Sequence, residues 1–249
     1  MSNQSNRSKR SKGGGGAARR PANRSSSGLS GRVIVFGGLA IVVVVAVIIA
    51  LVSSGGDDGS SASAGQQETA SVEVQGESLP PFDGSARADA AIGDTVPTIT
   101  GEDFDEQSVT VAPDGSPQVV TVLVHSCPHC QAEVPRVVEL ADQGLFDGVT
   151  VTAIPTGTNE DAANYPPSAW LEREDWPFRV LLDDEQSKAA RALGTTSVPY
   201  FVFLDGEGKV VGRFSGEMES GDLETVIAAL KAGERLPLPG VPGASTSTN

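Results

Sequence analysis

The sequence predicts one α/β domain, with a mixed central sheet covered by helices on both faces, preceded by a single transmembrane helix. Three observations lead to this prediction. An uncharged apolar run of 20 residues, 33–52, lies near the N-terminus. Over about residues 88–236, apolar β-branched runs alternate with helical patterns. Near the end of that region, Asp205-Gly206-Glu207-Gly208 separates two apolar runs and is a strong hairpin signal, which adds antiparallel strands to a sheet begun by parallel ones.

The first 32 residues are predicted to be a disordered, basic cytoplasmic tail. They contain eight Lys and Arg, no acidic residue and a glycine run at 13–16. Such a segment buries too little apolar surface to offset the entropy lost on ordering. It also has no aromatic residue that would stack on bases, so nucleic acid is not an expected partner.

Residues 33–52 are predicted to be a transmembrane helix. At a rise of ~1.5 Å per residue, 20 residues span the ~30 Å hydrocarbon core of a bilayer. Four Arg lie in the 20 residues before this run, and the next basic residue after it is Arg87. The positive-inside rule therefore predicts a single-pass protein of the cell membrane, with the N-terminus in the cytoplasm and the rest of the chain outside. The alternative is a cleaved signal peptide ending near Ala62-Ser63-Ala64, which delivers the domain to the same side.

The remaining chain is divided by its composition. Residues 53–86 are rich in Ser, Gly, Ala, Asp, Glu and Gln, and we expect a flexible linker there. Residues 87–236 form the predicted domain, and 237–249, rich in Pro, Gly, Ser and Thr, are predicted to be a disordered tail. All 32 acidic residues follow Val52, against ten Lys and Arg, which argues against nucleic acid or anionic lipid as a partner of the folded part.

The secondary structure of the domain follows from the apolar patterns. Residues 118–124 are β-branched and nearly all apolar, as in a central strand buried on both faces. Residues 131–143 place Val134, Val137 and Leu140 on one side of a helix. The full set of predicted strands is 96–100, 108–111, 118–124, 149–154, 179–182, 200–204 and 209–214. The predicted helices are 131–143, 168–174, 186–193 and 221–232.

The chain has only two cysteines, Cys127 and Cys130, at a predicted strand-to-helix junction with Pro128 and His129 between them. A thiol at the start of a helix lies beside unpaired backbone N–H groups and the positive end of the helix dipole, and both favour the thiolate. We therefore expect Cys127 to be the nucleophile and Cys130, one turn further on, to be shielded and to resolve the mixed disulfide. His129 is expected to stabilise the Cys127 thiolate, which makes the disulfide a better oxidant.

Other uses of two cysteines fit the sequence less well. A zinc site needs about four ligands, and the chain adds only His125 and His129. Haem attachment requires His directly after the second cysteine, where Gln131 stands. A purely structural disulfide that closes so short a loop stabilises a fold little. No metal or other cofactor is therefore expected, and the alternative that stays open is a non-catalytic module that binds a client or a metal ion.

The motif around the cysteines resembles two related groups of oxidoreductases. Cys127-Pro128-His129-Cys130 matches the active-site motif of DsbA-type enzymes, and residues 127–135 resemble the Cys-x-x-Cys-x-x-Glu-x-Pro signature of membrane-tethered TlpA-like thioredoxins. Downstream, Thr195-Thr196-Ser197-Val198-Pro199 resembles the thioredoxin loop that ends in a cis-proline before a hairpin. The resemblance covers about residues 92–232 and implies a thioredoxin fold.

The same resemblance implies roles for further residues. Val198 and Pro199 are expected to lie against the two sulfurs and to offer backbone groups to an extended substrate. Glu133 is implicated in proton handling near the thiols, the alternative being a solvated surface carboxylate. Pro135 is expected to kink the helix.

The implied activity is thiol–disulfide exchange on exported cysteine-containing proteins, with a membrane redox partner by analogy. The Pro-His dipeptide favours an oxidase or isomerase, whereas the tethered TlpA-like form favours a reductase. In these families an aromatic residue usually precedes the first cysteine, but here Ser126 follows His125, so neither direction of electron flow transfers. The aromatic residues Trp170, Trp176 and Tyr165 are expected to serve packing in the core or at the rim.

Overall fold

The computed structural model describes residues 66–86 and 88–239. Its central sheet has five strands: β4 (Gln118–Leu123), β5 (Thr150–Pro155), β6 (Arg179–Val180), β7 (Tyr200–Leu204) and β8 (Val210–Ser215). Their order across the sheet is β6-β5-β4-β7-β8. The first three of these strands in sequence are parallel, and β7 and β8 are antiparallel to their neighbours. The predicted mixed sheet with a hairpin at its edge is therefore confirmed.

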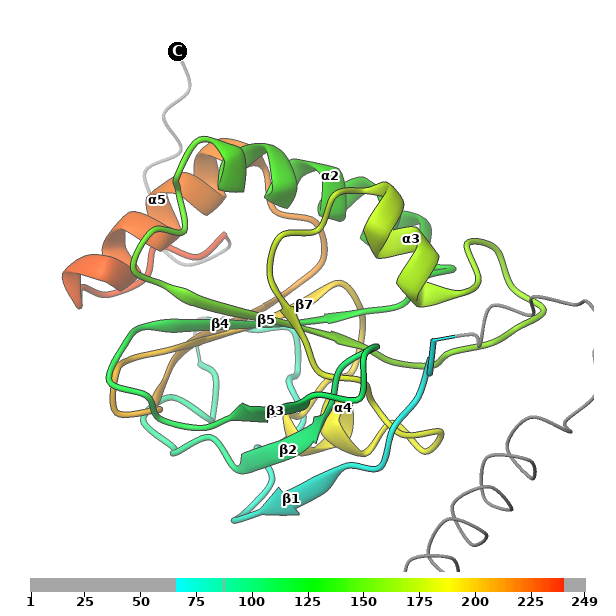
Figure 1. Cartoon of the computed structure of the whole chain (residues 1–249). Coiled ribbons are helices and arrows are strands. Elements are labelled where there is room, and N and C mark those ends of the chain that lie inside the picture. Colours follow the sequence, from blue (N-terminus) through cyan, green and yellow to red (C-terminus); the bar gives the residue numbers. More distant parts are fainter. Residues whose placement is uncertain (1–65, 87, 240–249) are drawn as a thin grey trace, which may run out of the picture. The chain divides into compact units, whose positions relative to one another are not determined.

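Helices cover both faces of this sheet. The helices are α2 (Pro128–Asp142), α3 (Pro167–Arg173), α4 (Lys188–Ala192) and α5 (Ser220–Ala232). Alternate side chains of β4 point to opposite faces, so Val119 packs with α2 and α5, whereas Val120 and Val122 pack on the side of α4. Figure 1 shows α2, α3 and α5 on one side of the sheet and α4 on the other.

A second, antiparallel sheet lies on the α4 side. It consists of β1 (Glu73–Gln75), β2 (Thr98–Glu102) and β3 (Ser108–Val111), in the order β1-β2-β3. Ile99 and Val111 face each other across β2 and β3, and both are fully buried in the same cluster as Val120. The small sheet thus forms a third layer beneath the main one (Figure 1).

The predicted flexible linker over 53–86 is wrong for residues 66–86, which fold onto the domain. Val72, Leu79 and Phe82 are buried, and β1 pairs with β2. Backbone bonds hold the segment as well, since the Leu79 and Phe82 amides donate to carbonyls at the end of α4 and just after it. These apolar residues are spaced too widely to produce a helical or strand period, so composition alone indicated a linker.

A buried ion pair attaches the same region to β8. Arg213 is 1% exposed and pairs with the carboxylate of Asp89, its Nε lying 2.8 Å from Oδ2. Its Nη1 donates to the carbonyl of Pro80 at 2.7 Å, and its guanidinium carbon lies 5.2 Å from the centre of the Phe82 ring. Gly194 permits this approach, because a Cβ there would lie 2.3 Å from the Pro80 oxygen.

The described chain begins beside α3. The carboxylate of Glu68 accepts hydrogen bonds from the backbone amide of Ser168, at 3.0 Å, and from its hydroxyl. The carbonyl of Glu68 accepts a bond of 3.5 Å from the Thr158 hydroxyl. A residue 100 positions away in the sequence therefore satisfies one of the free amides at the start of α3.

The predicted disordered tail over 237–249 is wrong for its first residues. Leu236 and Leu238 are buried, and a Cβ at Gly212 would lie within 3 Å of both side chains. The prolines between and after these leucines suggested a tail, but an extended chain can still bury alternate side chains. The predicted tail, transmembrane and linker segments over 1–65, and residues 240–249, lie outside the described residues. Of the helices within 66–86 and 88–239, none has the length and apolar character needed to cross a bilayer.

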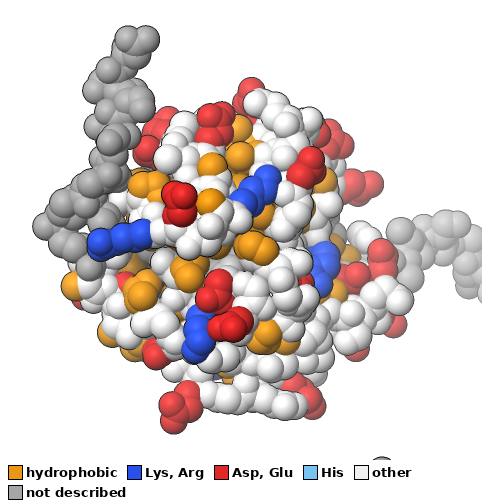
Figure 2. All heavy atoms as spheres, turned by 90° about the vertical axis from the view of Figure 1, so that its left-hand side faces the viewer, with side chains coloured by type: hydrophobic (Ala, Val, Ile, Leu, Met, Phe, Trp, Pro, Cys, Tyr) orange, Lys and Arg blue, Asp and Glu red, His pale blue; other side chains and the backbone are white. Residues whose placement is uncertain are grey.

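The surface of the domain reflects its acidic composition. On the face drawn in Figure 2, Asp and Glu side chains predominate over Lys and Arg, with apolar side chains between them.

Candidate active site

The two cysteines lie where β4 ends and α2 begins. Cys127 is the N-cap of α2, with extended backbone angles, and its carbonyl accepts the first helical bond from the Gln131 amide at 3.0 Å. Pro128 follows at the first helical position, where no amide hydrogen is needed and its fixed φ suits the helix. The helix predicted over 131–143 begins three residues earlier, at Pro128, and so includes the cysteine motif in its first turn.

The two thiols differ in environment. Cys127 is half-buried, whereas Cys130 is fully buried, and both are free thiols. The Val124 amide donates to the Cys130 sulfur at 3.4 Å. Burial raises the pKa of Cys130 to about 12, the proximity of Cys127 adding to the shift and the Val124 bond opposing it. In this dithiol form Cys130 is therefore a neutral thiol, in the shielded position expected for it.

The predicted proline loop lies against the first cysteine. The Val198–Pro199 peptide bond is cis, and the carbonyl of Val198 lies 3.8 Å from the Cys127 sulfur. Pro199 is buried, and its carbonyl accepts a bond of 2.9 Å from the amide of Gly216. The structure thus brings together residues that are about 70 positions apart in the sequence.

Glu133 is buried, so the alternative of a solvated surface carboxylate is wrong. Its Oε2 accepts bonds from the Met218 amide at 3.0 Å and from Nη1 of Arg136 at 2.6 Å. Its Oε1 has no hydrogen-bond partner among the described residues. Burial raises the pKa of Glu133 to about 7, although Met218 and Arg136 both stabilise the charged form. A carboxyl group with this pKa exchanges its proton near neutral pH.

His129 makes a side-chain contact with Glu217. Its side chain is 70% exposed, and its Nδ1 lies 2.7 Å from Oε1 of Glu217, in the turn between β8 and α5. The hydrogen bond from His129 is the main reason that the pKa of Glu217 is lowered. The other carboxylate oxygen of Glu217 lies 3.5 Å from Nη2 of Arg136.

Three residues of this network were missed by sequence reasoning. Arg136 stands three positions after Glu133, a spacing that places both side chains on the same helix face and offers a usable signal. Glu217 and Met218 lie more than 80 positions from their partners, and nothing local in the sequence points to them. Only the antiparallel hairpin brings their turn to α2.

His125 is buried, and both of its ring nitrogens are engaged. Nδ1 lies 2.7 Å from the carbonyl of Ala163, and the amide of Asn159 donates to Nε2 at 3.2 Å. Within the described residues, no three His, Cys, Asp or Glu side chains converge closely enough to hold a metal ion.

The three aromatic residues outside the motif divide between core and rim. Trp170 is buried and Trp176 is half-buried in packed clusters, as expected. Tyr165 is 42% exposed and lies at the rim, with its ring against His125.

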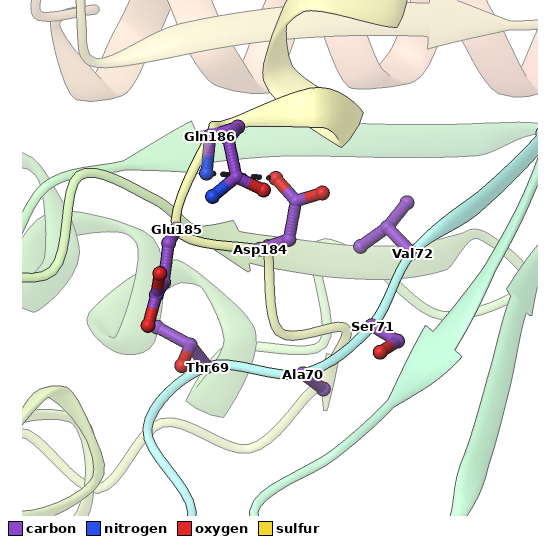
Figure 3. Close-up of a pocket in the computed structure, with 7 residues that line it drawn as sticks. All are labelled: Thr69, Ala70, Ser71, Val72, Asp184, Glu185 and Gln186. Carbon is purple, nitrogen blue, oxygen red and sulfur yellow. Dashed lines mark hydrogen bonds between the residues drawn. The ribbon is translucent and has the colours of Figure 1, made fainter.

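The domain also has a pocket whose lining lies outside the cysteine motif. Figure 3 shows a pocket of about 380 Å³ between the chain leading to β1 and the turn before α4, in which the amide of Gln186 donates to the Asp184 carboxylate. Its lining residues are Thr69, Ala70, Ser71, Val72, Asp184, Glu185 and Gln186. It includes neither cysteine. Exchange between sulfurs requires an accessible sulfur more than a deep cavity, so we place the candidate active site at Cys127.

Comparisons with known proteins agree with this geometry. The model of the family described as Redoxin matches residues 91–230. The thiol:disulfide interchange protein DsbE of Pasteurella multocida (strain Pm70) is 29% identical over 139 residues, which are 55% of this chain and 72% of that protein. The protein of the same name from Haemophilus influenzae is 28% identical over 149 residues, covering 58% and 74%.

Among solved structures, a hypothetical protein from Sinorhizobium meliloti 1021 superimposes with a TM-score of 0.52. It is 19% identical and covers 60% of this chain and 89% of its own, so this likeness concerns the fold alone.

Proposed function

Since the chain belongs to the Redoxin family, we propose that it exchanges disulfides in exported proteins through Cys127 and Cys130. It is a thiol–disulfide oxidoreductase, as are the relatives named thiol:disulfide interchange protein. The observation that carries the proposal is the pair of unlike thiols, one half-buried at a helix start and one fully buried a turn further on.

In the first step Cys127 is the nucleophile. The helix dipole and the amides of the first turn of α2 favour its thiolate. Its sulfur bonds to one sulfur of a substrate disulfide, that disulfide breaks, and the second substrate sulfur leaves as a thiolate that takes a proton from water. The backbone of Val198, beside the attacking sulfur, pairs with the extended substrate chain and aligns its disulfide, and Pro199 next to it is held by the Gly216 amide.

In the second step Cys130 resolves the mixed disulfide. Its thiol must first lose a proton, which burial opposes by raising its pKa to about 12. Glu133, one turn further along α2 and itself buried, accepts that proton, because its pKa of about 7 lets it hold one near neutral pH. The Cys130 sulfur then bonds to that of Cys127, and the substrate leaves as its second thiolate. Two electrons have passed from the enzyme to the substrate, and the reverse sequence oxidises a substrate dithiol.

His129 and Pro128 act on the first thiol indirectly. Pro128 fixes the backbone at the helix start. The Glu217 carboxylate engages the His129 ring, so the stabilisation that His129 gives to the Cys127 thiolate is smaller than an unpaired His would give.

The compartment and direction of electron flow are part of the proposal. The apolar run 33–52 supports a membrane anchor with the enzyme outside the cytoplasm, where exported proteins and a membrane redox partner meet it. Equilibrating the full-length protein with glutathione measures the potential of the Cys127/Cys130 pair. A value near about −120 mV indicates an oxidase, and one below about −200 mV a reductase.

Trapping experiments test the exchange itself. In the full-length chain, Cys130→Ala should accumulate mixed disulfides with exported proteins through Cys127, because the resolving thiol is gone. The matched variant Cys127→Ala should accumulate none. Absence of trapped species in Cys130→Ala, together with failure of the wild type to reduce a small disulfide, would favour a non-catalytic module that binds a client or a metal ion.

A further inference from the structure

The loop between β5 and α3, residues 156–166, borders the proposed active site. β4 and β5 are parallel neighbours, so their carboxyl ends open at the same edge of the sheet. The cysteine motif follows β4, and this loop follows β5. The two segments therefore lie side by side at the sheet edge where the thiols stand.

His125 fastens this loop to the cysteine motif. A neutral ring with its hydrogen on Nδ1 satisfies both contacts, donating to the Ala163 carbonyl and accepting from the Asn159 amide. The carbonyl of His125 also accepts a bond of 3.4 Å from the Asn164 side chain. Arg173, on α3, holds the oxygen of that same side chain at 2.9 Å. These hydrogen bonds hold the loop at Asn159, Ala163 and Asn164.

Tyr165 is the large apolar side chain that this loop exposes. Its ring meets the His125 ring edge-on, with centroids 6.2 Å apart, yet 42% of the residue is exposed. Within the described residues, Ile92 is the only other large hydrophobic residue with comparable exposure, and it lines a pocket near the C-terminal leucines. His125 stands two positions before Cys127, a span of at most ~7 Å between Cα atoms. A substrate segment of a few residues therefore reaches from the Cys127 sulfur to Tyr165.

We propose that Tyr165 is a specificity-determining residue that contacts the polypeptide flanking the substrate cysteine, and that His125 is the positioning residue that holds it there. The inference rests on the proposed function. An aromatic ring that is already immobilised offers a large contact area at little cost in conformational entropy. The substrates it favours are extended polypeptides with an apolar side chain a few residues from the cysteine. Small aliphatic disulfides are too short to contact the Tyr165 ring while they react at Cys127.

The test measures how fast the reduced full-length protein reduces each of two disulfide substrates. One is a peptide disulfide with Phe two residues from the cysteine, and the other is hydroxyethyl disulfide. Replacing Tyr165 with Ala should lower kcat/KM for the peptide about tenfold, mainly through KM, and leave the small disulfide unchanged. Tyr165→Phe should keep most of the peptide activity. The matched control Ile92→Ala should leave both substrates unchanged.

Variants of His125 test the positioning role. His125→Ala should reproduce the loss of peptide activity alone, and His125→Asn should restore part of it, because its amide can still donate to Ala163. The double variant with Tyr165→Ala should be no worse than either single one, since both act on one contact.

The outcomes separate this inference from the function on which it rests. The inference is overturned if Tyr165→Ala lowers kcat/KM equally for both substrates. It is also overturned if Ile92→Ala lowers kcat/KM for the peptide as much as Tyr165→Ala does. Either result leaves the exchange activity standing. If the wild type reacts with neither disulfide, the proposed function itself fails. The Tyr165 and Ile92 comparison remains decisive even where a His125 variant does not fold.

Discussion

Glu133 is a buried carboxyl group whose pKa lies well above its ordinary value. A carboxyl group this deeply buried keeps one oxygen unpartnered within the described part of the chain, and its proton affinity rises accordingly. Its pKa is about 7 in the folded protein, against an ordinary value of 4.5. The folded state therefore binds a proton that the unfolded state has already released between these two pH values.

This difference predicts a dependence of stability on pH. The contribution of Glu133 is fully present below pH 4.5 and is lost as the pH rises to about 7, by up to about 3 kcal/mol. Glu133→Gln should lack this loss, because its side chain is neutral throughout. Urea unfolding of the reduced wild type and variant at pH 5 and pH 8 measures the loss as a difference in the free energy of unfolding.

The control for that measurement is Glu139→Gln, an exposed position on the same helix. It should lose stability between pH 5 and pH 8 as the wild type does. A loss of the same size in Glu133→Gln would show that the buried carboxyl is not responsible.

Individual site residues differed in how far the sequence could predict them. The cysteines and Pro199 stand in motifs whose spacing is visible in the chain. The partner of His129 could not be anticipated, because Glu217 is 88 positions away and comes close only through the β7–β8 hairpin. The Met218 amide that donates to Glu133 is likewise 85 positions away.

At the scale of elements, two charged contacts join the start of α2 to the turn before α5. Glu217 contacts His129 and Arg136, and Arg136 also holds Glu133. The charge of Glu217 raises the pKa of Glu133. Glu217 thus influences the pKa of Glu133 through its charge, without a direct contact between the two side chains.

Replacing Glu217 with Gln should lower the pKa of Glu133, since a nearby negative charge is removed and Arg136 is left to a single partner. The pH range over which stability is lost should then move down. Carbon-detected NMR titration of the Glu carboxyl groups measures the shift. Glu219→Gln, exposed two residues further on, is the control and should leave the titration of Glu133 unchanged.

Predicted and observed elements agree where the apolar pattern is regular. The strand over 200–204 has the predicted bounds, and α5 begins one residue before its prediction. β1 was missed because Glu73–Gln75 offers a single apolar residue between two polar ones. Strands this short carry no period and are specified by their partner, here β2.

For the molecule as a whole, the domain is longer at both ends than its sequence pattern indicates. The segment 66–86 buries Val72, Leu79 and Phe82, and the C-terminal end buries Leu236 and Leu238. Fully burying such a side chain stabilises a fold by about 1.5–3 kcal/mol, so each end contributes a large part of a typical domain stability.

Truncation should reveal these contributions. A fragment 66–239 should unfold cooperatively, whereas 87–239 should be largely unfolded or much less stable, having lost β1 and the partners of Arg213 around Pro80. A fragment 66–235 should have an intermediate denaturation midpoint. Circular dichroism in urea distinguishes them. Equal midpoints for 66–239 and 87–239 would mean that the first segment is only loosely associated.

The attachment of Glu68 to Ser168 and Thr158 has a geometric consequence for a chain tethered to a bilayer, as proposed. The described chain begins beside the loop that carries Tyr165, since Glu68 contacts Thr158 in that loop and Ser168 just after it. In the proposed tethered protein, the length of residues 53–65 limits how far the Cys127 sulfur reaches from the lipid surface. Shortening residues 53–65 should therefore restrict which clients are reached without altering the chemistry of the thiols.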